Sequence, residues 1–383
     1  MKKFSFCIAI FAFLFFWASC GIFGKNQPID PKPEPKPQAR DYGIYTLHGF
    51  GKWEPSLPFW DLPWLDGVKI MVYWSKVEKK PGVYDFSLID YHLQLAASKG
   101  KKVVLSIVTA DERRGDYLPD SATPPWVFAS GATAVDHQYP GAEVPDKPSK
   151  IPVYWEGTYL AAYGRFIREL AERYDGEPTL ARVEIGVGIY GETIISKALI
   201  HGVPGEVEKW AQFGLTKDEG PLLWVATVNN IIDIYTANFQ QTDLALLISD
   251  SSLGAINPEI NKPGLADKYA SHAASQRVAL QFCGTLPDFP YGSWPADVLD
   301  AHRNQVPVVY EANGPSGGFG AYCSPDQVNI GKLQGTVATM QQRGARSTSF
   351  WCGDIIRAKM DPEFYKVFAD LSDWLQANPA RIQ

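Results

Sequence analysis

The sequence alternates short apolar runs with segments of helical periodicity along most of its length. Apolar, β-branched runs between turn residues predict buried strands, and apolar positions spaced three and four apart predict helices that pack on them. The predicted strands are Gly43–Leu47, Val68–Trp74, Lys102–Val108, Ala181–Val187, Leu244–Ser249, Val278–Cys283, Val306–Glu311 and Ser347–Trp351. The predicted helices are Ser87–Lys99, Thr158–Tyr174, Leu222–Phe239, Pro263–Ser275, Pro295–Asn304, Gln327–Arg343 and Pro362–Ala377. The segment after the first strand is short and rich in proline, so no helix is predicted there.

Eight such units in residues 41–383 predict an α/β fold with one domain, a (β/α)8 TIM barrel. In such barrels the active site lies at the C-terminal ends of the strands. The alternative is a doubly wound open sheet, which would carry a glycine-rich dinucleotide loop after its first strand. The sequence GFGK at residues 49–52 is too weak a match to that loop, so the barrel is preferred.

The N-terminus predicts export. Two lysines precede an apolar run from Phe4 to Trp17, which is shorter than the roughly 20 residues that span a bilayer. The following ASCG resembles a bacterial lipobox, in which Cys20 would be lipidated after cleavage. Trp17 is unusual at that distance from the cysteine, so cleavage by the ordinary signal peptidase is the alternative. We therefore expect a lipoprotein-type signal peptide in residues 1–20 and a lipid anchor that holds the protein in the bacterial cell envelope.

Residues 21–40 contain Pro-x repeats, which predict an extended tether that forms no core. The net charge of −6, with no basic block, argues against a nucleic-acid partner. The chain is instead rich in aromatic residues, with 12 Trp and 18 Tyr. Beyond the signal, Cys283, Cys323 and Cys352 allow at most one disulfide, which an export compartment would permit. No CxxC or HxH spacing is present, so no metal site is predicted.

Two predicted strands end in a glutamate. The segment LARVEIGVGIYGET carries Gly186, Gly188 and Gly191 and ends near Glu192. Glycine interrupts strands where another backbone or a ligand must approach closely. The segment QVPVVYEANGPSGG ends its apolar run at Glu311, before a Gly/Pro/Asn turn. A pair of carboxylates at one barrel end is the machinery of glycoside hydrolysis.

Glu184 is a competing candidate for the acid. It lies in the middle of its predicted strand beside Arg182. A buried carboxylate at such a position is stabilised by pairing inside the barrel, so a structural role is preferred.

Two segments resemble known glycosidases. VEIGVGIYGET is similar to the strand-four segment of β-amylases, whose Glu-x-Gly-x-Gly-x-x-Gly-Glu pattern ends in the catalytic acid, here Glu192. VYWSKVEKKPGVYDFSLIDYHLQLAASKGKKVVLSI resembles the strand-two to strand-three segment of clan A barrel hydrolases, notably the families 35 and 42 β-galactosidases. In those families the acid/base and nucleophile glutamates follow strands four and seven, as Glu192 and Glu311 would. Clan A enzymes usually carry Asn where this chain has Gly191.

The resemblance implies that Glu192 is the general acid/base. By analogy with clan A, Glu311 is the nucleophile and configuration is retained; by analogy with β-amylases, Glu311 is the base that activates water, with inversion. The two routes differ in carboxyl separation, about 5–5.5 Å for retention and about 6.5–9.5 Å for inversion. Retention is preferred, and neither route needs a cofactor.

Further side chains are expected to contact substrate at the barrel mouth. Trp74 and Trp351 end predicted strands, where indoles stack on sugar rings. Polar groups expected at the same rim are His48, Asp111, Arg114, Asp250 and Gln281, and Tyr190 and Asn313 neighbour the two glutamates. The long loop from Asp111 to Trp155, which carries Trp126 and Tyr139, predicts a wall of the cleft.

The sequence thus predicts a glycoside hydrolase that acts on an oligo- or polysaccharide. One alternative is a glycan-binding lipoprotein that has the barrel but no turnover. Another is a structural or adhesive envelope protein, whose rim aromatics would form a flat exposed patch.

Overall fold

A computed structural model describes residues 43–111, 121–138, 148–287, 293–319 and 322–378. The described residues belong to one compact unit. The predicted signal peptide and tether lie outside the described residues. None of the helices in the described ranges is both long enough and apolar enough to cross a membrane.

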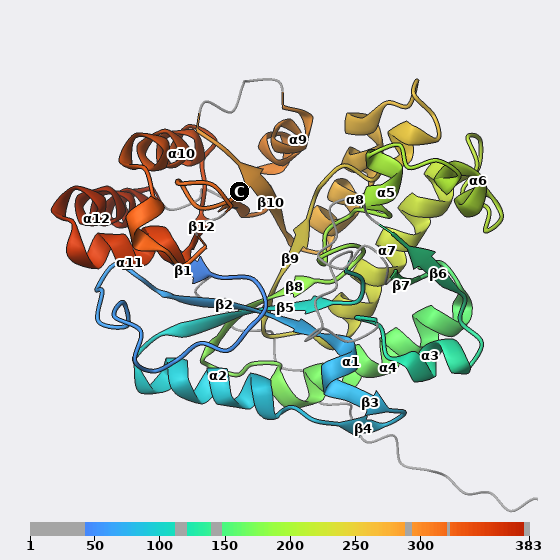
Figure 1. The fold of residues 1–383 in the computed structure, drawn as a ribbon, viewed down its shortest axis with the longest axis horizontal. Helices are drawn as coiled ribbons and strands as arrows, with labels where there is room; N and C mark the ends of the chain where they lie inside the picture. The colour runs from blue at the N-terminus through green and yellow to red at the C-terminus, as the bar shows by residue number, and fades with distance from the viewer. Residues whose placement is uncertain (1–42, 112–120, 139–147, 288–292, 320–321, 379–383) are drawn as a thin grey trace, which may run out of the picture. The chain divides into compact units, whose positions relative to one another are not determined.

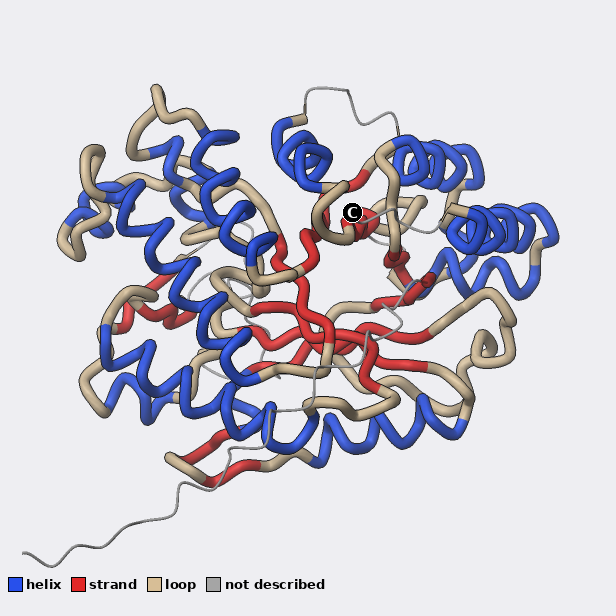
Figure 2. Tube along the Cα trace, turned by 180° about the vertical axis from the view of Figure 1, so that it is seen from behind, coloured by secondary structure: helices blue, strands red, loops and turns tan. Residues whose placement is uncertain are grey.

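Eight parallel strands form a closed barrel in the order β1-β12-β11-β10-β9-β8-β5-β2, which confirms the predicted (β/α)8 fold. Figure 1 shows these strands surrounded by the helices that connect them, and Figure 2 shows the same arrangement from behind. The barrel strands are β1 Gly43–Leu47, β2 Gly67–Tyr73, β5 Lys102–Val108, β8 Leu180–Ile185, β9 Asp243–Leu247, β10 Ala279–Thr285, β11 Val308–Ala312 and β12 Ser347–Trp351.

The helices that follow the strands cover the outside of the barrel. The main ones are α2 Ser87–Ser98, α4 Gly157–Tyr174, α7 Gly220–Asn238, α8 Lys262–Ser275, α9 Trp294–His302, α10 Ile330–Gln342 and α12 Pro362–Ala377. Short helices are α1 Trp74–Val77, α3 Pro125–Ala129, α5 Lys197–Ile200, α6 Glu206–Ala211, α11 Cys352–Met360, η1 Leu253–Ala255 and η3 Pro325–Gln327. Two hairpins lie outside the barrel, β3 Glu78–Lys80 with β4 Val83–Tyr84 and β6 Ala134–His137 with β7 Ser149–Pro152.

The strands have two different faces, because successive side chains of a strand point to opposite sides. On β2, Val68, Ile70 and Val72 belong to the large core shared with the helices. Lys69, between them, points into the barrel and contacts carboxylates from β8 and β11. The outward face therefore supplies most of the apolar core, and the inward face is free to carry charge.

The structure differs from the predicted elements at two places that affect the site. The second strand ends at Tyr73, and Trp74 begins the short helix α1. The fourth strand ends at Ile185, because the glycine-rich segment that follows turns back on itself.

Candidate active site at the C-terminal end of the barrel

Each glycine between β8 and Glu192 has a defined steric reason. A Cβ on Gly186 would lie 2.1 Å from the carbonyl oxygen of Ile107 on β5, and one on Gly188 would lie 2.0 Å from that of Ile194. Gly191 has a φ of +84°, in the left-handed region that favours glycine. Gly186 and Gly188 thus serve close approach of backbone to backbone, one of the two reasons expected from the sequence.

This turn presents Glu192 at the C-terminal end of the barrel. The amide of Gly188 donates to the carbonyl of Glu192 over 2.8 Å, and the amide of Thr193 donates to Leu247 of β9 over 3.0 Å. The Glu192 side chain is partly exposed, and its Oε2 accepts a hydrogen bond from the hydroxyl of Ser249, just after β9. Two neighbouring strands therefore hold this carboxylate.

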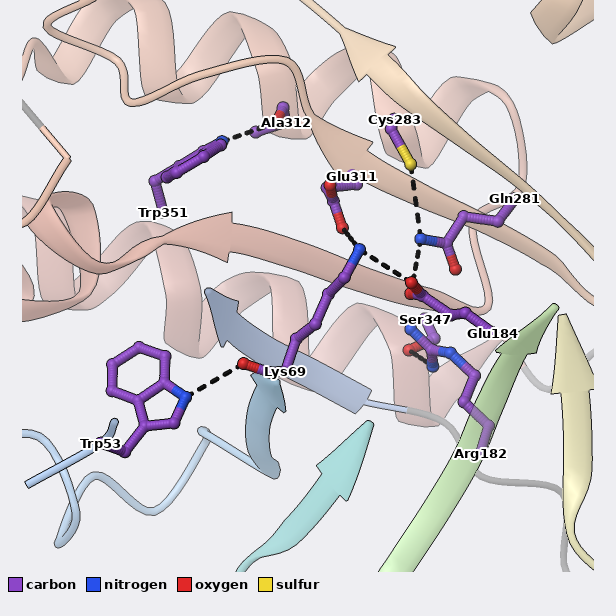
Figure 3. A network of polar contacts seen from close by, with 10 residues as sticks. All are labelled: Trp53, Lys69, Arg182, Glu184, Gln281, Cys283, Glu311, Ala312, Ser347 and Trp351. Carbon is purple, nitrogen blue, oxygen red and sulfur yellow. Dashed lines mark hydrogen bonds and ion pairs between the residues drawn. The ribbon is translucent and has the colours of Figure 1, made fainter. Parts of the chain in front are cut away.

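Glu311 is the fourth residue of β11 and points into the barrel, where it meets Lys69 (Figure 3). Lys69 Nζ lies 2.8 Å from Glu311 Oε2 and 2.9 Å from Glu184 Oε2. Gln281 Nε2 donates to the other Glu184 oxygen, Oε1, over 2.8 Å. One lysine therefore bridges two buried carboxylates from β8 and β11, and an amide from β10 completes the contact to Glu184.

The two bridged carboxylates differ in their proton affinity. Burial raises the pKa of Glu311, and this effect, together with the nearby negative charge of Glu184, exceeds the opposing effect of Lys69. Burial also acts to raise the pKa of Glu184, but the charges of Lys69 and Arg182 outweigh it and lower the net pKa. Burial acts to lower the pKa of Lys69, but the two carboxylates raise it overall, so the lysine stays charged. Glu184 is therefore the more firmly ionised partner, in agreement with its predicted structural role.

Glu192 and Glu311 lie close enough to influence each other. The charge of Glu192 contributes to the raised pKa of Glu311. Cys283 on β10 lies among Glu311, Glu192 and Glu184, whose charges add to the effect of burial in raising its thiol pKa. The fold thus brings the two predicted catalytic glutamates to one end of the barrel.

Trp351 is the last residue of β12, as predicted, and its indole contacts the residue after Glu311. Its indole Nε1 donates to the carbonyl of Ala312 over 3.0 Å, and its ring is partly exposed. Tyr322 lies against it, with ring centroids 5.0 Å apart. These two aromatic rings therefore stand next to the end of β11.

Trp74 does not lie at the mouth, so its predicted contact with substrate is wrong. It is fully buried, and its ring stacks on Phe166 of α4 with centroids 5.4 Å apart. Its Nε1 donates to Glu78 over 2.8 Å. Trp126 packs against it edge-on at 6.1 Å and donates to the carbonyl of Glu78, so Trp126 also belongs to the packing outside the barrel. Neither indole has the position expected of a sugar platform.

Two predicted polar contacts have structural partners instead. Gln281 is completely buried beneath the mouth, where it holds Glu184. Asp250 is partly exposed and forms an ion pair of 2.7 Å with Lys262 at the start of α8. It also accepts from the amide of Ser252, which fixes the loop after β9.

The remaining predicted contacts lie at strand ends. His48 is partly exposed, packs on Trp53 at 4.1 Å and has a pKa lowered by burial. Asp111 is buried and accepts from the Tyr73 hydroxyl.

Two more of these residues neighbour the glutamates. Tyr190 has a φ of 58°, and its amide donates to Ala110 over 3.0 Å. Asn313 is partly exposed directly after β11. Arg114 and Tyr139 lie outside the described residues, as does much of the predicted loop wall.

Three residues at this site were not predicted from the sequence: Lys69, Ser249 and Tyr322. Lys69 had a visible signal, because it is a charged residue within the otherwise apolar strand GVKIMVY. Ser249 ends a predicted strand, but a serine there is too common to be informative. Tyr322 comes to Trp351 only through the fold of the segment after β11.

Comparison with known proteins agrees with the barrel fold. Residues 65–195 match a sequence family described as Beta-galactosidase, glycoside hydrolase family 42. The matched segment includes Glu192 but not Glu311. The catalytic domain of a β-amylase from Paenibacillus polymyxa has a similar structure, with a TM-score of 0.55 and 12% identity over 89% of this chain and 100% of that one. A β-galactosidase from the psychrophilic Marinomonas ef1 gives a TM-score of 0.51 and 14% identity over 88% of this chain and 60% of that one. No curated protein sequence matches this chain.

At these identities the two structures show the fold alone. The family match and the closed parallel barrel fit a clan A (β/α)8 glycoside hydrolase. They support a glycosidase as the class of this protein.

Proposed function

We propose that this protein hydrolyses glycosidic bonds of an oligo- or polysaccharide, with Glu192 as general acid/base and Glu311 as nucleophile. The observation that carries the proposal is the placement of both glutamates at the C-terminal end of one barrel, close enough for the charge of Glu192 to act on Glu311. Paired carboxylates in this position are what glycoside hydrolysis requires.

The proposed reaction uses the contacts of each carboxylate. Glu192 protonates the glycosidic oxygen as the leaving group departs, while Ser249 orients its side chain. Glu311 attacks the anomeric carbon, and Lys69 fixes the carboxylate through Oε2. Water then hydrolyses the glycosyl-enzyme, with Glu192 acting as base. Configuration is retained by this route.

The reaction is tested on a panel of glycans and aryl glycosides that includes β-galactosides and α-glucans. We expect Glu192→Gln and Glu311→Ala each to lower kcat by orders of magnitude, because both groups act in the transition state. The exposed Glu172 on α4 provides a matched control, and Glu172→Gln should leave turnover unchanged. Near-normal turnover in Glu311→Ala would remove the paired-carboxylate mechanism. Binding without turnover in the wild-type protein would leave a glycan-binding protein as the better description.

Azide distinguishes a nucleophile from a base. With Glu311→Ala, azide should restore turnover by forming a glycosyl azide of configuration opposite to the substrate, if Glu311 is the nucleophile. Nuclear magnetic resonance of the first product of the wild-type protein gives the same answer independently, since an inverted anomer would assign Glu311 as the base.

Trp351 is proposed as the sugar platform beside Glu311. Trp351→Ala should weaken glycan binding by about 1–3 kcal/mol, a magnitude taken from aromatic stacking on bases. Glu311→Ala should leave binding largely intact. Equal affinities of the Trp351→Ala and wild-type proteins, measured by calorimetry, would exclude this platform.

We also propose that the protein is exported and held in the cell envelope by a lipid on Cys20. The support is the sequence before and around that cysteine. Cys20→Ala should move the protein from the membrane fraction to the soluble exported fraction. Cys7→Ala is the matched control, because Cys7 lies in the segment that cleavage removes. Unchanged membrane association of the Cys20→Ala protein would contradict the anchor.

A further inference from the structure

Two cysteines far apart in sequence lie on neighbouring backbone segments at the mouth of the barrel. Cys323 lies between β11 and η3, and Cys352 is the first residue of α11, directly after β12. The amide of Gly353 donates to the carbonyl of Tyr322 over 2.7 Å. This hydrogen bond joins the peptide group before Cys323 to the peptide group after Cys352. This hydrogen bond therefore brings the backbones of the two cysteines close to each other, as a disulfide requires.

The side chains of this pair also meet. Cys323 is exposed and Cys352 is buried, and the two thiols lie close enough to shift each other's pKa. The neighbouring Cys352 thiol lowers the pKa of Cys323. The same contact, together with burial, raises the pKa of Cys352. The accessible thiol is thus the one that ionises first, the arrangement that favours attack on an external disulfide.

The residue before each cysteine is aromatic, and these two rings also meet. Tyr322 precedes Cys323, Trp351 precedes Cys352, and the ring centroids lie 5.0 Å apart. The indole of Trp351 in turn donates a hydrogen bond to the carbonyl of Ala312, the residue after Glu311. A covalent bond between the cysteines would therefore hold the Tyr322 ring against the Trp351 ring.

We propose that Cys323 and Cys352 form a reversible disulfide that fixes the Tyr322 segment onto Trp351. The oxidant is a small disulfide such as oxidised glutathione. The Cys323 thiolate attacks it and releases one glutathione thiolate, giving a mixed disulfide. The Cys352 thiol then loses its proton and attacks Cys323 Sγ, releasing the second glutathione. Two protein thiols and one external disulfide thus yield one protein disulfide and two external thiols.

The bond is tested on the exported protein with its tether, reduced and then incubated with oxidised glutathione. We expect intact mass to show the loss of two hydrogen atoms, and thiol titration after unfolding to show two fewer thiols. Cys323→Ser and Cys352→Ser should each abolish this change, whereas Cys283→Ser should retain it. An unchanged thiol count, or a mixed disulfide that persists on Cys323, would overturn the proposal.

Fixation of the segment is measured by deuterium uptake. Uptake in residues 322–329 should fall on oxidation of the wild-type protein and stay constant in Cys352→Ser. Equal uptake in the oxidised and reduced wild-type proteins would show that the bond fixes nothing.

The effect on glycan affinity rests on the proposed function. Oxidation should lower the KM for a hydrolysed glycan several-fold with little change in kcat, since Tyr322 and Trp351 would bind sugar without taking part in bond cleavage. An unchanged KM would refute this role of the bond. If no glycan is hydrolysed but the disulfide forms, the proposed function fails and the disulfide stands.

Discussion

Replacing Lys69 by methionine tests the charge balance inside the barrel. Methionine is similar in length and apolar, so the change removes the charge with little change in volume. Lys69 is only 2% exposed, and its Nζ lies 2.9 Å from Glu184 and 2.8 Å from Glu311. The variant leaves both carboxylates buried without their shared cation.

The size of the effect follows from these distances. Coulomb's law with an effective dielectric constant of about 20 gives about 6 kcal/mol of attraction for each pair. Part of this loss is recovered because an unpaired buried carboxyl binds a proton, and removal of one partner from a buried ion pair typically costs about 3–5 kcal/mol. We therefore expect Lys69→Met to lower the free energy of unfolding by about 3–5 kcal/mol at pH 7.

The cost should depend on pH in a defined direction. In the wild-type protein the folded-state pKa of Glu184 is lowered, so its pairing stabilises the fold above the unfolded-state pKa and is lost as pH falls through the folded value. Without Lys69, burial raises the pKa of both carboxyls, so the folded variant binds more protons and loses stability as pH rises. The difference between the two proteins should thus be smaller at pH 5 than at pH 8.

Urea unfolding at pH 5, 7 and 8 measures this difference. Lys69→Arg retains the charge and should cost less than Lys69→Met. The double variant Lys69→Met/Glu184→Gln should be more stable than Lys69→Met alone, because it leaves one fewer unpaired carboxylate. A cost below about 1 kcal/mol that is the same at all three pH values would refute the proposed charge balance.

Three further changes test other parts of the molecule. Glu184→Gln should move the acidic limb of kcat/KM to lower pH, because the charge of Glu184 helps to raise the pKa of Glu311; a limb that stays in place would contradict this coupling. Burial raises the pKa of Asp354 from 3.8 to about 6, worth about 3 kcal/mol, so this group makes the fold less stable as pH rises between these values. Asp354→Asn should therefore raise the free energy of unfolding by up to about 3 kcal/mol at pH 8 and leave it unchanged at pH 4, as urea titrations would show. Gly186→Ala would place its Cβ 2.1 Å from a carbonyl oxygen of β5 and should lower the free energy of unfolding by more than about 2 kcal/mol. The control Gly157→Ala meets no atom within 4 Å and should change the free energy of unfolding by less than about 1 kcal/mol, as urea unfolding would show.

The barrel could be predicted because its signal is local and repeated. Each strand and each helix carries its own periodicity, and eight units leave few folds open. The positions of Glu192 and Glu311 followed from the same pattern, since strand ends of a barrel meet at one mouth. The closed sheet confirms this level of the prediction.

The face on which a side chain lies was harder to predict. The second strand ends one residue earlier than predicted, and α1 starts at Trp74, so this indole packs under α4 instead of at the mouth. Along a strand, a shift of one residue exchanges the two faces. The register that points Lys69 at Glu184 and Glu311 likewise depends on strand pairing, such as that of Lys69 with Val104, which a single sequence does not show.

The contacts of the two proposed catalytic glutamates differ in a way that favours their separate roles. Glu311 is held by the ammonium of Lys69, which can only donate hydrogen bonds and stabilises the ionised carboxylate. Glu192 is held by the hydroxyl of Ser249, which can donate to a carboxylate or accept from a carboxylic acid. The Ser249 contact therefore survives when Glu192 gains or loses a proton, as a general acid/base must do in each cycle. A nucleophile, in contrast, has to be ionised, and the positive charge of Lys69 favours the ionised form of Glu311. Lys69 thus opposes the rise that burial causes in the pKa of Glu311, while the Ser249 contact allows Glu192 to exchange protons.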